Sequence, residues 1–222
     1  FLDAFVWGNF NLGEVPVNVK VGRHTVVWGE GLLIGGHAIS YGQAPVDGVK
    51  AVTSPGIETK EVFLPVGQLS FKAQLTDKLS LAGQYYFEWE PTRVPNGGTY
   101  LMGADTSPNV DRLGLAAGVA ADRVEGLEPG NTGNWGLGLK WDVDAIESTL
   151  GFFYRQFNDY NPETGIQFTG FRQLVPGNPA TTVPSTFRFV YAQDVKLIGA
   201  SLARSMRLKV VAEGVESQDQ VD

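Results

Sequence analysis

The stretch 79–89, LSLAGQYYFEW, alternates between two kinds of side chain and constrains the fold more than any other. Its odd positions are apolar apart from Gly83, and its even positions are mostly polar. A period of two predicts a β-strand with one oily face. The length suits a tilted strand that crosses a bilayer, and the aromatic end is typical of a lipid-facing strand near the membrane interface. A strand of a soluble β-sandwich, with its oily face turned to a core, has the same pattern.

The same alternation recurs along the chain. We expect strands within 1–11, 17–28, 68–76, 79–89, 133–142, 147–157 and 186–199. Short turns alternate with long Gly- and Pro-rich stretches at 29–65, 91–131 and 158–184, and 113–121 could be a helix or a strand. This alternation is typical of outer-membrane barrels, whereas sandwich strands are spaced evenly. We predict an all-β, antiparallel, partial transmembrane β-barrel of about eight strands in hairpins with long irregular loops.

Composition excludes several classes of function. The 222 residues carry 17 Lys and Arg against 24 Asp and Glu, a net charge of −7 without a basic cluster, so no nucleic-acid partner is expected. The absence of cysteine excludes disulfides and thiolate metal sites. His24 and His37 are weak metal candidates because they form no ligand motif. We therefore expect that the chain binds no cofactor and is not an enzyme.

Charged residues share the polar phase of the predicted strands. A charged side chain facing lipid is costly, so in a membrane these residues would line the lumen. They are Lys20, Lys72, Glu88, Lys140 and Arg155, with Gln74 and Gln84 among them. In a soluble protein they would form an ordinary solvated face. Both signs of charge occur, so no strong ion selectivity is expected.

Many short motifs resemble, in order and spacing, a family of proteobacterial outer-membrane barrels known only as a domain of unknown function. The matching residues are Val21-Gly22-Arg23, Val27-Trp28-Gly29-Glu30, Gly35-Gly36, Pro45-Val46-Asp47, Pro55-Gly56, Glu58-Thr59-Lys60-Glu61, Leu64-Pro65-Val66, Leu79-Ser80-Leu81, Tyr86-Phe87-Glu88-Trp89-Glu90-Pro91-Thr92-Arg93, Gly98-Thr99-Tyr100, Asp105, Phe153-Tyr154, Asp194-Val195-Lys196-Leu197 and Gly199. The resemblance covers about residues 1–200 and implies a porin-like barrel. It also implies traffic of hydrophobic compounds such as steroids or lipids, beside efflux-type transport components. His24 departs from the Gln usual there.

Four charged residues within these motifs suggest how the 29–65 stretch is held. If it folds inward as a constriction or plug, Arg23, Glu30, Asp47 and Glu61 could cluster in the lumen and pin it to the wall by ion pairs. Independent, solvated lumen charges are the alternative. With the lumen residues Lys72, Glu88, Lys140 and Arg155, these four are the candidate site residues.

The last segment, 201–222, lacks the pattern of barrel strands. It begins with a helical, basic pattern, and Ala212 to Glu216 resemble the Ala-Glu-Gly-Val-Glu motif of EAL-type cyclic-di-GMP phosphodiesterases. Glu213 would match a catalytic-site residue of that family, but the partners that a metal site needs are missing. We therefore divide the chain into a barrel fragment, 1–200, and an EAL-like tail, 201–222, that is not a complete domain.

The favoured hypothesis is a fragment of an outer-membrane barrel of a Gram-negative bacterium, in contact with lipid, that conducts a small hydrophobic solute. An EAL-type phosphodiesterase fragment and a soluble β-rich ligand-binding domain are the alternatives. A partial barrel leaves two unpaired strand edges, which lipid does not tolerate. The isolated chain is thus expected to be unstable or incomplete as a membrane protein.

Overall fold

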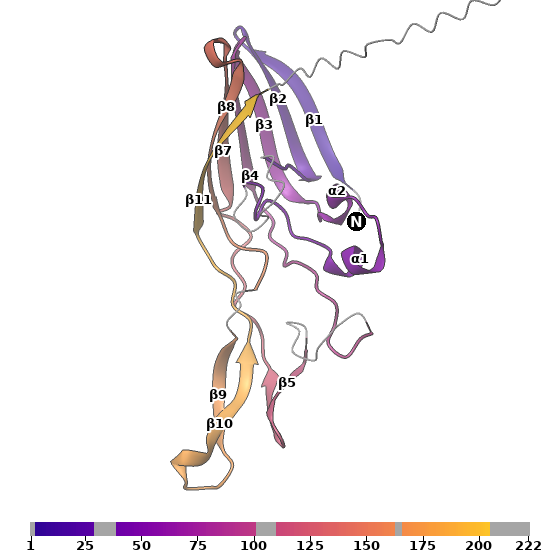
Figure 1. Cartoon of the computed structure of the whole chain (residues 1–222), viewed down its shortest axis with the longest axis vertical. Coiled ribbons are helices and arrows are strands. Elements are labelled where there is room, and N and C mark those ends of the chain that lie inside the picture. Colours follow the sequence, from indigo (N-terminus) through magenta and orange to yellow (C-terminus); the bar gives the residue numbers. More distant parts are fainter. Residues whose placement is uncertain (1–2, 29–38, 101–109, 163–165, 205–222) are drawn as a thin grey trace, which may run out of the picture.

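The computed structural model describes residues 3–28, 39–100, 110–162 and 166–204, which form two sheets and two short helices (Figure 1). The larger sheet contains, in spatial order, β1 (Ala4–Leu12), β2 (Val15–His24), β3 (Val66–Thr76), β4 (Leu79–Tyr86), β7 (Trp135–Val143), β8 (Ser148–Phe157) and β11 (Val195–Arg204). All of its neighbouring strands are antiparallel. The helices are α1 (Gly48–Thr53) and α2 (Thr59–Val62). Among the described residues, no helix is long and apolar enough to cross a bilayer.

The connections of the larger sheet differ sharply between its two rims. At one rim the turns are short: 13–14, 77–78, and 144–147 with the 3-10 turn η2 (Asp144–Ile146). At the other rim the chain makes the long connections 25–65, 87–134 and 158–194 (Figure 1). The predicted alternation of short turns at one rim with long connections at the other is confirmed.

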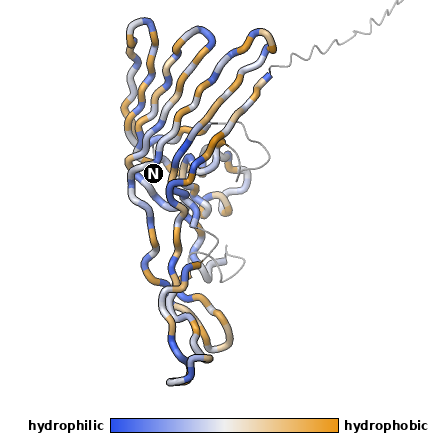
Figure 2. The backbone as a smooth tube through the Cα atoms, turned by 90° about the vertical axis from the view of Figure 1, so that its left-hand side faces the viewer, coloured by the Kyte–Doolittle hydropathy of each residue, from blue (hydrophilic) through white to orange (hydrophobic). Residues whose placement is uncertain are grey.

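The two faces of the larger sheet have opposite chemistry. On the outer face, Leu137, Trp141 and Phe152 keep 42%, 47% and 49% of their surface exposed. On the inner face, Gln84 and Arg155 are 3% and 1% exposed. Hydrophobic and hydrophilic residues therefore alternate along these strands (Figure 2). The sheet has the reverse of the usual soluble arrangement, in which the apolar phase is covered.

Residues between β2 and β3 cover the part of the inner face near the long connections, where Tyr41, Gly42 and Gln43 contact Arg155 and Tyr86. The helices α1 and α2 of the same connection lie at that rim of the sheet (Figure 1). The backbone of this connection bonds to itself, from Leu64 N to Pro45 O and from Asp47 N to Val62 O, both at 2.8 Å. We call residues 39–65 the inward segment. Side-chain bonds from the sheet hold it in place.

The smaller sheet is built from the other two long connections. Its order is β5 (Arg112–Ala116), β6 (Val119–Arg123), β10 (Thr182–Arg188) and β9 (Gln167–Gln173), with β6 and β10 parallel and the 3-10 turn η3 (Pro179–Thr181) before β10. A buried cluster holds it together. It consists of Trp89, Val110, Leu113, Ala121, Tyr160, Phe187, Phe189 and Tyr191. Because Trp89 and Tyr160 follow β4 and β8, this core joins the smaller sheet to the larger one.

The structure corrects several expectations. Eleven strands occur in the described part of the chain, more than the predicted eight or so. The additional strands lie in stretches that we expected to be irregular: β5 and β6 form a hairpin across 113–121, and β9 and the start of β10 lie within 158–184. The predicted strand 186–199 is divided between β10 and β11.

The predicted boundary at residue 200 falls inside a strand. β11 continues through Ser201 to Arg204, where we expected a helical pattern, and it pairs with β8 over its whole length. Glu213 and the rest of the EAL-like tail lie outside the described residues. Within the described part the larger sheet does not close, because β1 and β11 stand at its two edges.

The smaller sheet should depend on Phe187. This ring is fully buried and packs edge-on against Phe189, with ring centres 5.7 Å apart. Replacing it with alanine (Phe187→Ala) should destabilise the smaller sheet by about 3–5 kcal/mol, because the substitution leaves a cavity. Hydrogen exchange of the β10 amides measures the loss. Phe171→Ala on exposed β9 is the matched control, and equal exchange in both variants would contradict this account of the core.

Candidate functional site

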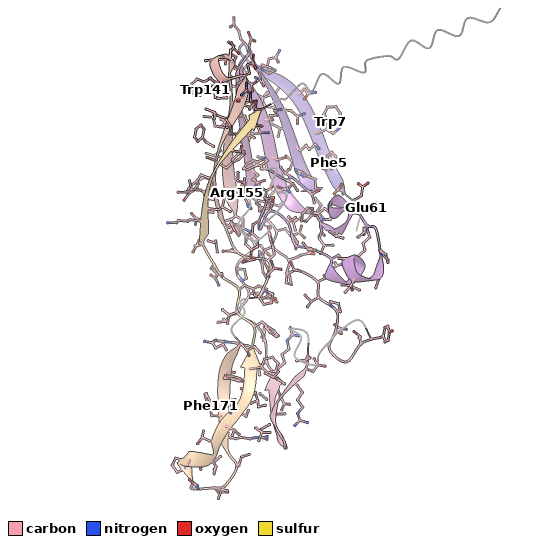
Figure 3. The ribbon with its side chains drawn as sticks, viewed as in Figure 1. Phe5, Trp7, Glu61, Trp141, Arg155 and Phe171 are labelled. Atoms are coloured by element: carbon pink, nitrogen blue, oxygen red, sulfur yellow. The ribbon has the colours of Figure 1, made fainter. Side chains whose placement is uncertain are left out.

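Arg155 lies on the inner face near the rim of the long connections, two residues before β8 ends at Phe157. Directly opposite Arg155 on the neighbouring strands β7, β4 and β3 lie Gly136, Gln84 and Ser70, and we call these four residues the row of Arg155. A Cβ at Gly136 would lie 2.8 Å from the Arg155 side chain, so this glycine leaves room for the stem of the arginine over β7. Figure 3 shows Arg155 in the crowded interior of the molecule. The buried guanidinium needs hydrogen-bond partners because an unpaired buried charge is very costly.

Arg155 binds the inward segment through backbone carbonyls. Its Nη1 donates to Tyr41 O at 2.5 Å, and its Nη2 donates to Gly42 O at 2.6 Å. The guanidinium also lies 4.7 Å from the centre of the Phe157 ring. The planar fork of arginine suits two adjacent acceptors, so one side chain fixes two consecutive residues of the segment.

Further hydrogen bonds on either side of Arg155 complete the attachment. The Tyr86 hydroxyl donates to Gln43 O at 2.7 Å. The buried Gln43 amide donates to Ile39 O at 2.9 Å and to Trp28 O at 3.1 Å, and it accepts from Trp28 N at 2.6 Å. The Tyr41 hydroxyl donates to Asp159 at 2.5 Å, and burial together with this bond raises the pKa of Tyr41. Tyr41 therefore stays a protonated donor at neutral pH.

The interior also contains polar atoms without a hydrogen-bond partner among the described residues. They include both amide atoms of Gln84, Nε of Arg155 and Nδ2 of Asn134. Each unpaired buried polar group costs about 1–3 kcal/mol. A polar interior of this kind suits contact with water or a polar ligand better than a dry core.

The predicted pinning residues have other partners than those expected. Arg23 lies 2.8 Å from Glu90 and 3.4 Å from Glu88, and it donates to Pro65 O, at the end of the inward segment, at 3.3 Å. Asp47 caps α1 through Lys50 N at 2.9 Å and lies 3.7 Å from Arg93.

Glu61 forms hydrogen bonds within the inward segment itself. Its side chain accepts from Glu58 N at 3.4 Å, and its carbonyl accepts from Lys50 Nζ at 2.9 Å. Glu30 lies outside the described residues. The ion pair of Asp47 with Arg93 therefore links the inward segment to the residues that follow β4. Arg23 on β2 and Arg155 on β8 both bind the segment to the sheet through its backbone carbonyls.

Two of the remaining candidates, Lys72 and Lys140, lie on the inner face of the sheet, and Glu88 follows the end of β4. Lys72 is exposed and borders a hollow of about 360 Å³ lined also by Asn18 and Gln74. Lys140 is exposed nearer the short turns. Glu88 accepts from Gly67 N at 2.6 Å in addition to pairing with Arg23. The three residues are spread over the sheet and its rim rather than gathered at one point.

The histidines give no metal site in the described residues. His24 Nε2 lies 2.7 Å from Ser70 Oγ and its Nδ1 lies 3.0 Å from Gly22 O, so both ring nitrogens have partners. His37 lies outside the described residues. No group of three metal-ligating side chains occurs in the part that the structure describes.

Comparison with known proteins assigns the chain at the level of family. Residues 1–220 match the family described as "Protein of unknown function (DUF1302)". The chain belongs to this family. The part of the chain that matches DUF1302 extends through 201–220, so the EAL-like motif lies inside the family match. No curated protein and no solved structure matches.

The sequence analysis missed the neutral residues of this DUF1302 site. Gln43 lies in a stretch without periodicity, so no pattern marked it. Tyr86 carried a signal, because it is an aromatic residue on the polar phase of its strand. Such a residue faces the interior, where its hydroxyl needs a partner.

Replacing Arg155 with glutamine should release the inward segment. Arg155→Gln removes both bonds to residues 41 and 42, and we expect faster proteolysis and amide exchange in 39–46, with less change in α1 and α2. Lys140→Gln, on the same face but exposed, is the control. If 39–46 stays as protected in Arg155→Gln as in the control, Arg155 is not the anchor.

Proposed function

We propose that this chain forms part of a porin-like β-barrel in the outer membrane of a Gram-negative bacterium and serves as a conduit for a small hydrophobic solute. The observation that carries the proposal is the reversed arrangement from β3 to β8, where the outer face is apolar and exposed and the inner face carries buried polar side chains such as Gln84 and Arg155. Lipid is the solvent in which such an outer face is stable.

The length and chemistry of the strands support a bilayer environment. The seven strands of the larger sheet are 8 to 11 residues long, close to the 9–11 that a tilted membrane strand needs. Trp141 near the short turns and Tyr85 near the long connections place exposed aromatic rings toward both ends of the outer face. Aromatic residues favour the two membrane interfaces.

The inner face supports a conduit rather than a solid core. Charged and amide side chains line it, and the inward segment narrows the space beside it. A segment of this kind, attached by Arg155 and Tyr86, would act as a constriction. Two parts of the proposal rest on the resemblance to the outer-membrane family: the hydrophobic nature of the solute and the association with efflux-type transport components.

The two alternative functions have less support. A soluble β-rich binding domain would leave a broad apolar face in water, where large exposed patches promote association. An EAL-type phosphodiesterase fragment rests on Glu213 and its neighbours, which lie outside the described residues. We expect no hydrolysis of cyclic-di-GMP by this chain, and measurable turnover would favour the enzyme instead.

Tryptophan quenching by lipid tests the outer face. Two variants each keep one of the five tryptophans, Trp141 on the outer face or Trp89 in the core of the smaller sheet, with the others changed to phenylalanine. In vesicles of brominated phospholipid we expect strong quenching of Trp141 and little of Trp89. Equal emission from Trp141 with and without bromine would exclude lipid contact at that face.

Single cysteines test the two faces against each other, because the chain has no cysteine of its own. Lys140→Cys lies on the inner face, and Leu137→Cys lies on the outer face of the same strand. In vesicles, a charged water-soluble maleimide should label the first at least tenfold faster, since it does not enter hydrocarbon. Similar rates at both positions would contradict a hydrated interior with a lipid-covered exterior.

A further inference from the structure

Four cations lie on the inner face of the larger sheet, within three consecutive rows of paired residues. Lys20 stands directly opposite Ser70 and so extends the row of Arg155 onto β2. Lys72 lies one row nearer the short turns, and Lys140 lies one row beyond Lys72. We call Lys20, Lys72, Lys140 and Arg155 the cationic patch.

The three rows of the cationic patch contain no acidic residue. The strand register fills them otherwise with apolar, small, amide and hydroxyl side chains. Within the part of the chain that the structure describes, no ion pair includes a member of the patch. The whole chain has a net charge of −7, so this face carries the opposite sign to the rest of the protein.

Carboxylates flank the cationic patch instead of entering it. Asp142 lies one row nearer the short turns, where it accepts from Thr149 Oγ1 at 2.5 Å. At the opposite rim Glu88 pairs with Arg23, and Asp3 precedes β1. The expectation of no strong ion selectivity placed Glu88 on this face. Because Glu88 lies beyond the end of β4, the face itself is positive.

The two lysines nearest the short turns are accessible to a solute. Lys72 and Lys140 are exposed, and neither ammonium group has a hydrogen bond or an ion pair among the described residues. Lys72 borders the hollow of about 360 Å³, which Asn9, Asn18 and Gln74 also line. Because each amide nitrogen carries two hydrogens, this hollow offers neutral donors beside the ammonium group.

Arg155 adds charge deeper in the same face. Its Nη1 and Nη2 bind carbonyls, which are neutral, so the positive charge is not cancelled. Its Nε and both amide atoms of Gln84, in the same row, have no hydrogen-bond partner among the described residues. This row is therefore polar as well as positive.

We propose that the inner face selects anions, so that the solute carries a negatively charged group such as a carboxylate, sulfonate or phosphate. Lys72 and Lys140 attract this group, and the amides around the hollow donate to it. Several like charges along one wall raise the local concentration of ions of opposite sign. The inference rests on the proposed conduit and deepens it, because it adds an anionic group to the hydrophobic solute.

The test compares two thiol reagents of opposite charge at one introduced cysteine, since the chain has none of its own. Ser80→Cys lies directly opposite Lys140 and diagonal to Lys72, which places its Cβ about 5 to 8 Å from theirs. Sulfonatoethyl methanethiosulfonate is an anion, and trimethylammonioethyl methanethiosulfonate is a cation with the same reactive group. The ratio of their rate constants cancels the reactivity of the thiol itself and reports the sign of the local potential.

The reaction is followed on the detergent-solubilised full chain at about 10 mM ionic strength, where the Debye length is about 30 Å. The anion-to-cation ratio at Ser80→Cys should be at least about tenfold higher than at Ala180→Cys, because several unit charges act on it. Ala180 is exposed on η3 and has no charged residue within 173–187.

Lysine variants in the Ser80→Cys background assign the effect to the cationic patch. Lys72→Gln and Lys140→Gln should each lower the ratio about threefold, because each removes one nearby unit charge. Lys196→Gln is the matched control, since it removes the same charge from the outer face of β11 and should leave the ratio unchanged. Far-ultraviolet circular dichroism confirms that each variant is folded.

Equal ratios at Ser80→Cys and Ala180→Cys, or an unchanged ratio in both lysine variants, would overturn the anion preference. The reaction needs no membrane insertion, so that result would leave the lipid tests of the conduit untouched. Conversely, an outer face that fails the lipid tests would remove the conduit and leave the positive inner face standing.

Discussion

The need to pair the polar groups of the inner face governs this structure. Strict alternation places every second side chain of seven neighbouring strands on one side, and along the middle of the sheet that side carries amides, hydroxyls and a guanidinium. These groups cannot be buried against apolar side chains without a cost of several kcal/mol. The inward segment supplies backbone carbonyls to Arg155 and Tyr86, whereas Gln84 stays without a hydrogen-bond partner among the described residues. The long β2–β3 connection is thus part of the sheet's own hydrogen bonding.

Arg155 shows that matching charges by sequence does not find every anchor. The pinning hypothesis paired charges among Arg23, Glu30, Asp47 and Glu61, and it gave Arg155 only as a residue that lines the lumen. The structure instead gives the guanidinium two carbonyls, which every residue possesses and no sequence pattern reveals. Gly42 is selected by geometry, because its φ is +62° and a Cβ would meet the ring of Phe157. Attachment through backbone carbonyls therefore fixes the backbone conformation at residues 41 and 42 more than it fixes which side chains occur there.

The sequence was most informative where the interactions are local. Hairpins with short turns, such as Asp77–Lys78, followed from a period of two on either side of a turn, and the two faces were assigned correctly. The smaller sheet was missed because its strands are short and its central pairing, β6 with β10, joins residues far apart in the chain. Such pairing leaves no periodic signal. The aromatic cluster of Trp89, Tyr160 and Phe187 assembles from three separate stretches for the same reason.

The parity of the larger sheet limits how the proposed barrel can close. Its seven strands are antiparallel throughout, so β1 and β11 run in the same direction. Direct pairing of these two edges, within one copy or between two copies with the same orientation, would be parallel. A barrel that is antiparallel at every contact has an even number of strands. Closure in that pattern therefore needs an odd number of further strands between β11 and β1, and it cannot be reached by joining two of these sheets edge to edge in one orientation.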